Sequence, residues 1–169
     1  MNIYMTTGTI DFMEKVKEKY KNESIILMNG GGHTLLLHET SGASVFQTPR
    51  KYEVVGAEGQ LSENGYYALD NVAVTDEGKP IFEHHYKTMG TKLKDLPGFI
   101  AFRLLRPIGS DTYIILTEWT EKRLYELWHN SPGSKLSNPN NFKDQGGATL
   151  HIFSSAPYTA TYKTPTEEI

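Results

Sequence analysis

The sequence predicts an α+β fold built from antiparallel sheets, and the order of the expected elements is the main reason. From residue 65 onward this order is strand, helix, strand, strand, helix, strand, which is ferredoxin-like. The first sixty residues repeat its opening with strand, helix, strand and strand. Because two such sheets can pack face to face in one chain, we divide the sequence into an N-terminal half, 1–64, and a C-terminal domain, 65–169.

The N-terminal half is expected to contain one helix among short strands. Strands are expected at residues 2–7, 24–28, 34–38 and 52–55. The helix follows Thr9, whose hydroxyl can accept an N–H group of the first turn. Residues at one-face helical spacing should form its buried side, namely Phe12, Met13, Val16 and Tyr20. The segment 29–32, with three consecutive glycines, reads as a hairpin turn.

In the C-terminal domain, too, turn residues separate the expected strands and helices. Strands are expected at 66–74, 99–106, 112–118 and 150–164. One helix should begin at Pro80, with Phe82, Tyr86, Met89 and Leu93 on its buried side. Another should be capped by Thr120 and bury Leu124, Leu127 and Trp128. The polar stretch 129–149 is expected to be a long loop, and loops of this length are often functional.

Composition excludes several classes of protein. The chain has 169 residues with 17 basic and 20 acidic side chains, and this balance argues against nucleic-acid binding. The absence of cysteine excludes disulfide scaffolds, thiol catalysis and iron–sulfur clusters. No apolar run approaches 18 residues and the first residues do not read as a signal peptide, so we expect a cytoplasmic protein without membrane contact.

Two residues stand out as candidates for a ligand site. Asn71 lies inside an expected strand, where asparagine is disfavoured, and its amide either faces solvent or points into a pocket. Trp128 lies near a helix end and a long loop, and it either packs in the core or forms a wall of a cleft. Trp119 is expected in the core, whereas Glu118 and Glu121 are expected to be solvated.

The histidines do not form a recognisable metal motif. His84 and His85 are adjacent on an expected helix and therefore point about 100° apart. The others are scattered, and no H-x-x-x-H spacing exists, so a dedicated zinc site is not expected. The glycine-rich segment 29–32 lacks the lysine of a phosphate-binding loop. The residues alone therefore predict a cleft near Asn71 and Trp128 without defining its chemistry.

Several segments resemble the haem-degrading monooxygenases of the antibiotic-biosynthesis-monooxygenase superfamily, whose members form a dimeric α+β barrel. They are residues 71–75 (NVAVT), 97–99 (PGF), 115–119 (ILTEW) and 124–128 (LYELW). Over its full length the chain resembles the larger Bacillus-type form, through 26–28 (ILM), 38–40 (HET), 45–47 (VFQ), 52–54 (YEV), 102–107 (FRLLRP) and 110–113 (SDTY). A staphylococcal relative assigned to signalling shares 103–107.

This resemblance implies two fused ferredoxin-like halves that form one barrel-like body, and oxidative opening of haem with release of iron. Haem would be both substrate and oxygen activator. Asn71 matches the family's catalytic asparagine, whose amide would bond the ligand on the iron, and Trp128 matches the tryptophan that would distort the porphyrin. Both residues would therefore contact haem. Residues 65–169 would be the antibiotic-biosynthesis-monooxygenase domain.

The sequence departs from the family at the iron ligand. The family's histidine lies ten residues after this tryptophan, and here that haem-contacting position is Asn138, whose amide is a poor iron ligand. The metal ligand is therefore open, with His84, His85, His129 and His151 as candidates.

We expect a monomeric haem-degrading monooxygenase that takes electrons from a separate reductase or small reductant, since no nicotinamide or flavin motif is present. Monomeric assembly is expected because the family's shorter members build the same body by dimerising. The alternative is a non-catalytic haem-binding, signalling or stress protein on the same fold, which the asparagine at position 138 favours. A third reading is a cofactor-free monooxygenase that acts on a polyphenol-like molecule.

Overall fold

The computed structural model describes residues 1–132 and 153–165, and within them the chain forms a closed barrel of eight strands covered by helices on two sides. The strands are β1 (Asn2–Gly8), β2 (Ile25–Gly30), β3 (His33–Thr40), β4 (Arg50–Gly59), β5 (Tyr66–Ala73), β6 (Phe99–Ile108), β7 (Thr112–Trp119) and β8 (Tyr158–Lys163). The helices are α1 (Ile10–Lys19), α2 (Lys79–Tyr86), α3 (Met89–Leu93) and α4 (Lys122–His129).

The order of strands around the barrel confirms the predicted fold class. The order is β1-β3-β2-β8-β5-β7-β6-β4, and each strand pairs antiparallel with its neighbours. Strands β1 to β4 are therefore adjacent to one another, and so are β5 to β8. Each group has the ferredoxin-like arrangement in which the first strand lies between the fourth and the third. A domain boundary at residues 64 and 65 agrees with this grouping and stays a prediction.

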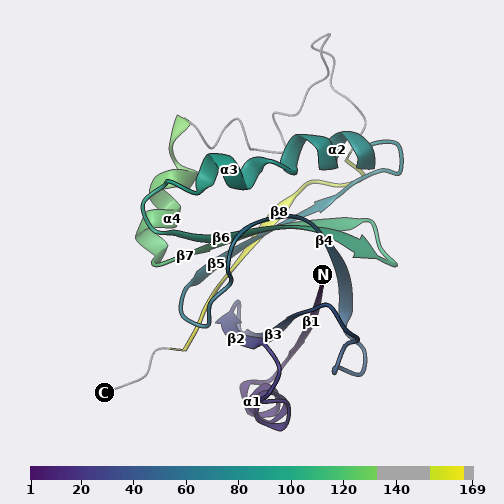
Figure 1. Ribbon diagram of the computed structural model, residues 1–169, viewed down its shortest axis with the longest axis vertical. Helices are drawn as coiled ribbons and strands as arrows, with labels where there is room; N and C mark the ends of the chain where they lie inside the picture. The colour runs from purple at the N-terminus through teal and green to yellow at the C-terminus, as the bar shows by residue number, and fades with distance from the viewer. Residues whose placement is uncertain (133–152, 166–169) are drawn as a thin grey trace.

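The hydrophobic core has three layers, which Figure 1 makes visible as helices on opposite sides of the barrel. The barrel interior holds side chains from both groups of strands, such as Met5, Leu37 and Leu116. Helix α1 covers the outer side of the N-terminal strands through Met13. Helices α2 and α3 cover the outer side of the C-terminal strands, and α4 packs beside them.

Local sequence signals explain most element boundaries. Thr9 caps α1 as predicted, because the N–H of Phe12 donates to its Oγ1 at 3.4 Å. The turn between β2 and β3 consists of Gly31 and Gly32, whose φ angles of 59° and 81° require glycine. Phe82, Tyr86, Met89 and Leu93 are buried as predicted, although their helix is broken into α2 and α3.

Other expectations for the helices are wrong. Thr120 does not cap α4, because its N–H donates to the carbonyl of Gly98 and the N-cap position falls on Glu121. Phe12 is 61% exposed, since only one of two adjacent helix positions can face the core and Met13 takes that place. Leu127 is likewise exposed, whereas its neighbour Tyr125 is buried.

Candidate functional site

Alternation along β5 decides which of its side chains can meet the helices. Leu69 and the residue opposite Asn71, Ile114, belong to the core inside the barrel. Val72 and its partner Tyr113 pack instead under α2 and α3. Because directly paired residues share a face and successive residues alternate, Asn71 faces the barrel interior. Its side chain is 6% exposed, and its Nδ2 donates to the carbonyl of Leu69 at 3.1 Å.

Trp128 lies on the other side of the same sheet. Its ring stacks on the fully buried Trp119, with the centroids 5.4 Å apart and the planes at 25°. Tyr125, one helical turn earlier, also packs against Trp128, at a centroid distance of 6.2 Å. Trp119 is thus a core residue, as predicted, and the half-buried Trp128 is the outer layer of an aromatic stack on the helix side.

The expectation that Asn71 and Trp128 face one ligand is therefore wrong, since the sheet lies between them. In this arrangement the Asn71 amide bonds to backbone in the barrel interior and does not face Trp128. The physical reason is the two-residue period of a strand, by which a shift of one position moves a side chain to the opposite face.

Asp70 is the polar side chain that β5 directs toward the helices. The hydroxyl of Thr159, its partner on β8, donates to its Oδ1. Burial raises the pKa of the Asp70 carboxyl, while the bond from Thr159 and the charge of His129 oppose that rise. Asp70 also helps to raise the pKa of Tyr86 on α2 and of Tyr125 on α4, for which burial is the larger cause.

These ring contacts and charge influences mark one region on the helix side of the C-terminal sheet, which we call the outer-face site. It consists of Asp70, Tyr86, Tyr125, Trp128, His129 and Thr159. The His129 ring stacks on Tyr125 at 5.4 Å with an angle of 21°, and its Nδ1 lies 3.4 Å from the phenol oxygen. The arrangement combines a group of flat rings with one half-buried carboxyl group.

The iron-ligand candidates are unequally placed. His84 and His85 are exposed on α2, and His129 is the one whose ring joins the aromatic stack of α4. Asn138 and His151 lie outside the described residues. Among residues 1–132 and 153–165, no three histidine, aspartate or glutamate side chains are grouped so as to hold a metal ion. The identity of the iron ligand stays a prediction.

Two acidic residues were misjudged or missed from sequence. Glu118 is fully buried, because β7 directs it inward, where it accepts a hydrogen bond from the N–H of Ser62 at 2.8 Å. The prediction that it is solvated is wrong, whereas the exposed Glu121 pairs with Arg123. Residue type alone does not distinguish Asp70 from Asn71, because both are polar and adjacent. The sequence does contain a signal for the orientation of Asp70. Val72 lies two residues further along β5 and packs under the helices, so Asp70 faces the same side.

Residues 66–136 match the family model described as antibiotic biosynthesis monooxygenase. The match covers less than half of the chain, and it identifies this segment as similar to an antibiotic biosynthesis monooxygenase domain. This segment contributes β5 to β7 and α2 to α4, so it contains every described residue of the outer-face site except Thr159.

Known relatives carry two different names at similar distance. The chain is 24% identical to a heme-degrading monooxygenase of Listeria monocytogenes, over 79% of this chain and 80% of that protein. It is 25% identical to the signal transduction protein TRAP of Staphylococcus epidermidis, over 85% and 84% of the two chains. Sequence similarity therefore does not separate an enzyme from a signalling protein.

Solved structures agree on the fold. A regulator of staphylococcal pathogenesis superposes with a TM-score of 0.84 and 22% identity, covering 98% of this chain and all of the other. The heme-degrading enzyme LmHde of Listeria monocytogenes gives a TM-score of 0.74 and 21% identity, with the same coverage. Within the described part of the chain, no helix is long and apolar enough to cross a membrane.

Proposed function

We propose that the protein binds haem at the outer-face site and opens the porphyrin ring oxidatively, with release of iron. The observation that carries the proposal is the set of flat rings on α4, where Trp128 rests on Trp119 and His129 rests on Tyr125. Haem is a large flat apolar molecule, and removal of such surface from water contributes about 25 cal/mol per Å². The named activity of the Listeria relative supports the same substrate.

The residues of the outer-face site are of the types that bind haem in proteins. Aromatic side chains suit the macrocycle, and an imidazole is the usual ligand of haem iron. Of the three described candidates, His129 is favoured because its ring already lies in the aromatic stack, whereas His84 and His85 lie on another helix. When bound, haem supplies the oxygen chemistry, and the chain orients it. Electrons would come from an external reductant or reductase.

We also propose that the protein works as a monomer in the cytoplasm. The barrel closes within a single chain, since both groups of four strands come from the same polypeptide. A second subunit is therefore not needed to complete the sheet around the outer-face site.

The second candidate function is haem binding or signalling without turnover. Two observations favour it: Asn71 faces the barrel interior, and position 138 carries asparagine where the resemblance places a histidine. The signal transduction protein TRAP, at 25% identity, supports this alternative. The two candidates differ in one outcome, which is loss of the porphyrin ring under reducing conditions.

A hemin titration followed by turnover separates these functions. We expect a saturable Soret band at one equivalent of hemin, and decay of that band with ascorbate and oxygen while a ferrous chelator traps the released iron. A saturable band that never decays supports the non-catalytic alternative. Absence of a saturable band contradicts both haem functions and favours the cofactor-free reading.

A further inference from the structure

A groove of about 230 Å³ lies between helix α1 and the connection from β3 to β4, on the outer side of the N-terminal strands. The helix contributes Phe12, Val16, Lys19 and Tyr20, which follow one another at one-face helical spacing. Residues 45–48 of the connection form the opposite wall. Because α1 lies across the barrel from α2, α3 and α4, the groove is separate from the outer-face site (Figure 1).

The walls of the groove are held by packing and hydrogen bonds. Phe46 is buried, its ring lies 5.9 Å from that of His38, and its N–H donates to Oγ of Ser44 at 3.0 Å. Earlier in the same connection, the carbonyl of Gly42 accepts a hydrogen bond from the Tyr4 hydroxyl at 3.2 Å. Helix α1 packs on the same core cluster, so both walls have one fixed support.

Most of the lining is apolar, and part of it is open to water. Phe12 is 61% exposed, whereas Val16, Tyr20 and Val45 are partly buried against the core. An apolar body that covers Phe12 removes both surfaces from water, which favours binding. The volume is below the roughly 300–1,000 Å³ of pockets for drug-sized ligands. The groove therefore suits a molecule of one or two rings and not a macrocycle.

Lys19 gives this groove a positive rim. Among the lining residues, all of which lie in the described part of the chain, it is the only charged one. Its Nζ lies 5.3 Å from the centroid of the Tyr20 ring, and within the described residues it forms no ion pair. The acidic side chains of α1 lie on the next surface around the helix, at Asp11, Glu14 and Glu18. The carbonyl end of α1 carries about half an elementary negative charge, which the full charge of Lys19 outweighs.

We propose that this groove binds a small carboxylate with an apolar body of one or two rings. The body covers Phe12 between α1 and the connection, and the carboxylate pairs with Lys19. Lys19 then distinguishes a carboxylate from a neutral molecule of the same shape. The inference goes beyond the proposed function and does not depend on haem binding.

Indole-3-acetate and indole-3-acetamide are matched probes, because they differ in charge and hardly in shape. Titration of the ¹⁵N-labelled protein, followed by ¹H–¹⁵N correlation spectra, should show saturable shifts confined to residues 12–20 and 45–48. We expect the Kd of indole-3-acetate to be about two- to fivefold lower than that of indole-3-acetamide, the range for one solvent-exposed ion pair.

Three variants separate charge from apolar contact. Lys19→Gln should raise the Kd of indole-3-acetate to that of indole-3-acetamide, and Phe12→Ala should weaken both probes alike. The matched control is Lys15→Gln, one helical turn before Lys19 and outside the lining, which should change neither Kd. All three side chains are exposed, so the thermal unfolding midpoint should stay near that of the unaltered protein.

Three results would overturn the inference. Shifts that fail to saturate, or that lie outside the two segments, rule out the site. Equal affinities for the two probes, with no response to Lys19→Gln, rule out the carboxylate. Shifts in the same segments on raising the protein concentration without a probe would show that a second copy of the chain occupies the groove instead.

Discussion

Glu118 shows how a single buried residue links this fold to pH. Its carboxylate accepts two hydrogen bonds from Ser62, one from the N–H at 2.8 Å and one from the hydroxyl. Burial nevertheless dominates and raises the pKa of the Glu118 carboxyl. The same carboxylate contributes, after burial, to the raised pKa of Tyr67 on the neighbouring strand. A negative charge on Glu118 therefore lowers the stability of the folded protein.

The sign of the pH dependence follows from the raised pKa of Glu118. The folded protein holds this proton more tightly than the unfolded chain, so the free energy of unfolding falls as pH rises from the ordinary glutamate range through the raised pKa. One proton gives a slope of at most about 1.4 kcal/mol per pH unit. Urea titrations at several pH values should show a smaller slope for Glu118→Gln, while the control Glu121→Gln, at an exposed position, should follow the unaltered protein. An identical slope for Glu118→Gln would contradict this assignment.

For single residues, the sequence predicts a side chain's role correctly where near neighbours determine it. The prediction fails where the role depends on which face of a strand the side chain occupies. Thr9 and Trp119 were placed correctly, because a cap and a large apolar residue at a strand end depend on near neighbours. Asn71 was placed on the wrong face because Asp70 and Asn71 are both polar, and only the pairing with β7 shows which of them faces the helices.

Helix α4, which carries Trp128, is positioned by a glycine at the start of β6. Gly98 has a φ angle of 80°, and a Cβ atom there would lie 2.3 Å from Cδ1 and 2.8 Å from Cβ of Leu124. Its carbonyl also accepts the N–H of Thr120 just before the helix. The close approach of α4 to the sheet therefore depends on the absence of a side chain at position 98.

Gly98→Ala should displace α4 and destabilise the protein by more than the control Gly109→Ala. Both positions have φ angles near 80°, so each substitution costs about 1–2 kcal/mol in backbone strain. Position 109 has no atom within 4 Å of the new methyl group, whereas position 98 adds the clash with Leu124. Thermal unfolding measures the difference, and near-ultraviolet circular dichroism reports the stacking of Trp128 on Trp119. Equal losses at both positions would contradict the account of how α4 is held.

At the scale of elements, most of the fold could be predicted from the sequence. Turn glycines and apolar periodicity located β1 to β7, because these signals act within a few residues. The break between α2 and α3 was missed, since the apolar spacing continues through it from Tyr86 to Met89. For the last strand, the structure places β8 at Tyr158–Lys163, whereas the prediction began at residue 150 and 150–152 lie outside the described residues.

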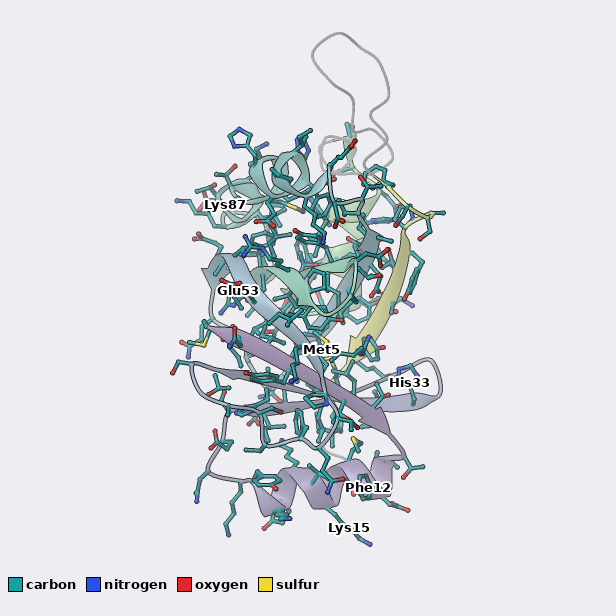
Figure 2. The ribbon with its side chains drawn as sticks, turned by 90° about the vertical axis from the view of Figure 1, so that its right-hand side faces the viewer. Met5, Phe12, Lys15, His33, Glu53 and Lys87 are labelled. Carbon is teal, nitrogen blue, oxygen red and sulfur yellow. The ribbon has the colours of Figure 1, made fainter. Side chains whose placement is uncertain are left out.

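Across the whole molecule, one buried ion pair joins the two groups of strands. Arg103 on β6 donates from Nε to Oε2 of Glu39 on β3 at 2.7 Å. The same guanidinium donates to the carbonyl oxygens of Gly59 and Phe102, at 2.9 and 2.8 Å. Both charged side chains lie mostly out of contact with water. Figure 2 shows the strands of the two groups meeting around a shared interior, whose core side chains come from both groups.

Loss of this pair should weaken the barrel as a whole. Arg103→Met leaves the Glu39 carboxylate buried without a partner, and removal of one member of a buried pair costs about 3–5 kcal/mol. The matched control is Arg123→Met at an exposed position, which should change the free energy of unfolding by less than about 0.5 kcal/mol. Urea unfolding measures the change for both variants. A loss of less than about 1 kcal/mol for Arg103→Met would contradict the role given to Arg103.

The position of bound haem tests the central claim most directly. A crystal structure of the complex should show the macrocycle against Trp128, on the side of β5 that carries Asp70, with Asn71 separated from it by the sheet. Haem located inside the barrel, beside α1, or in contact with Asn71 would contradict the account.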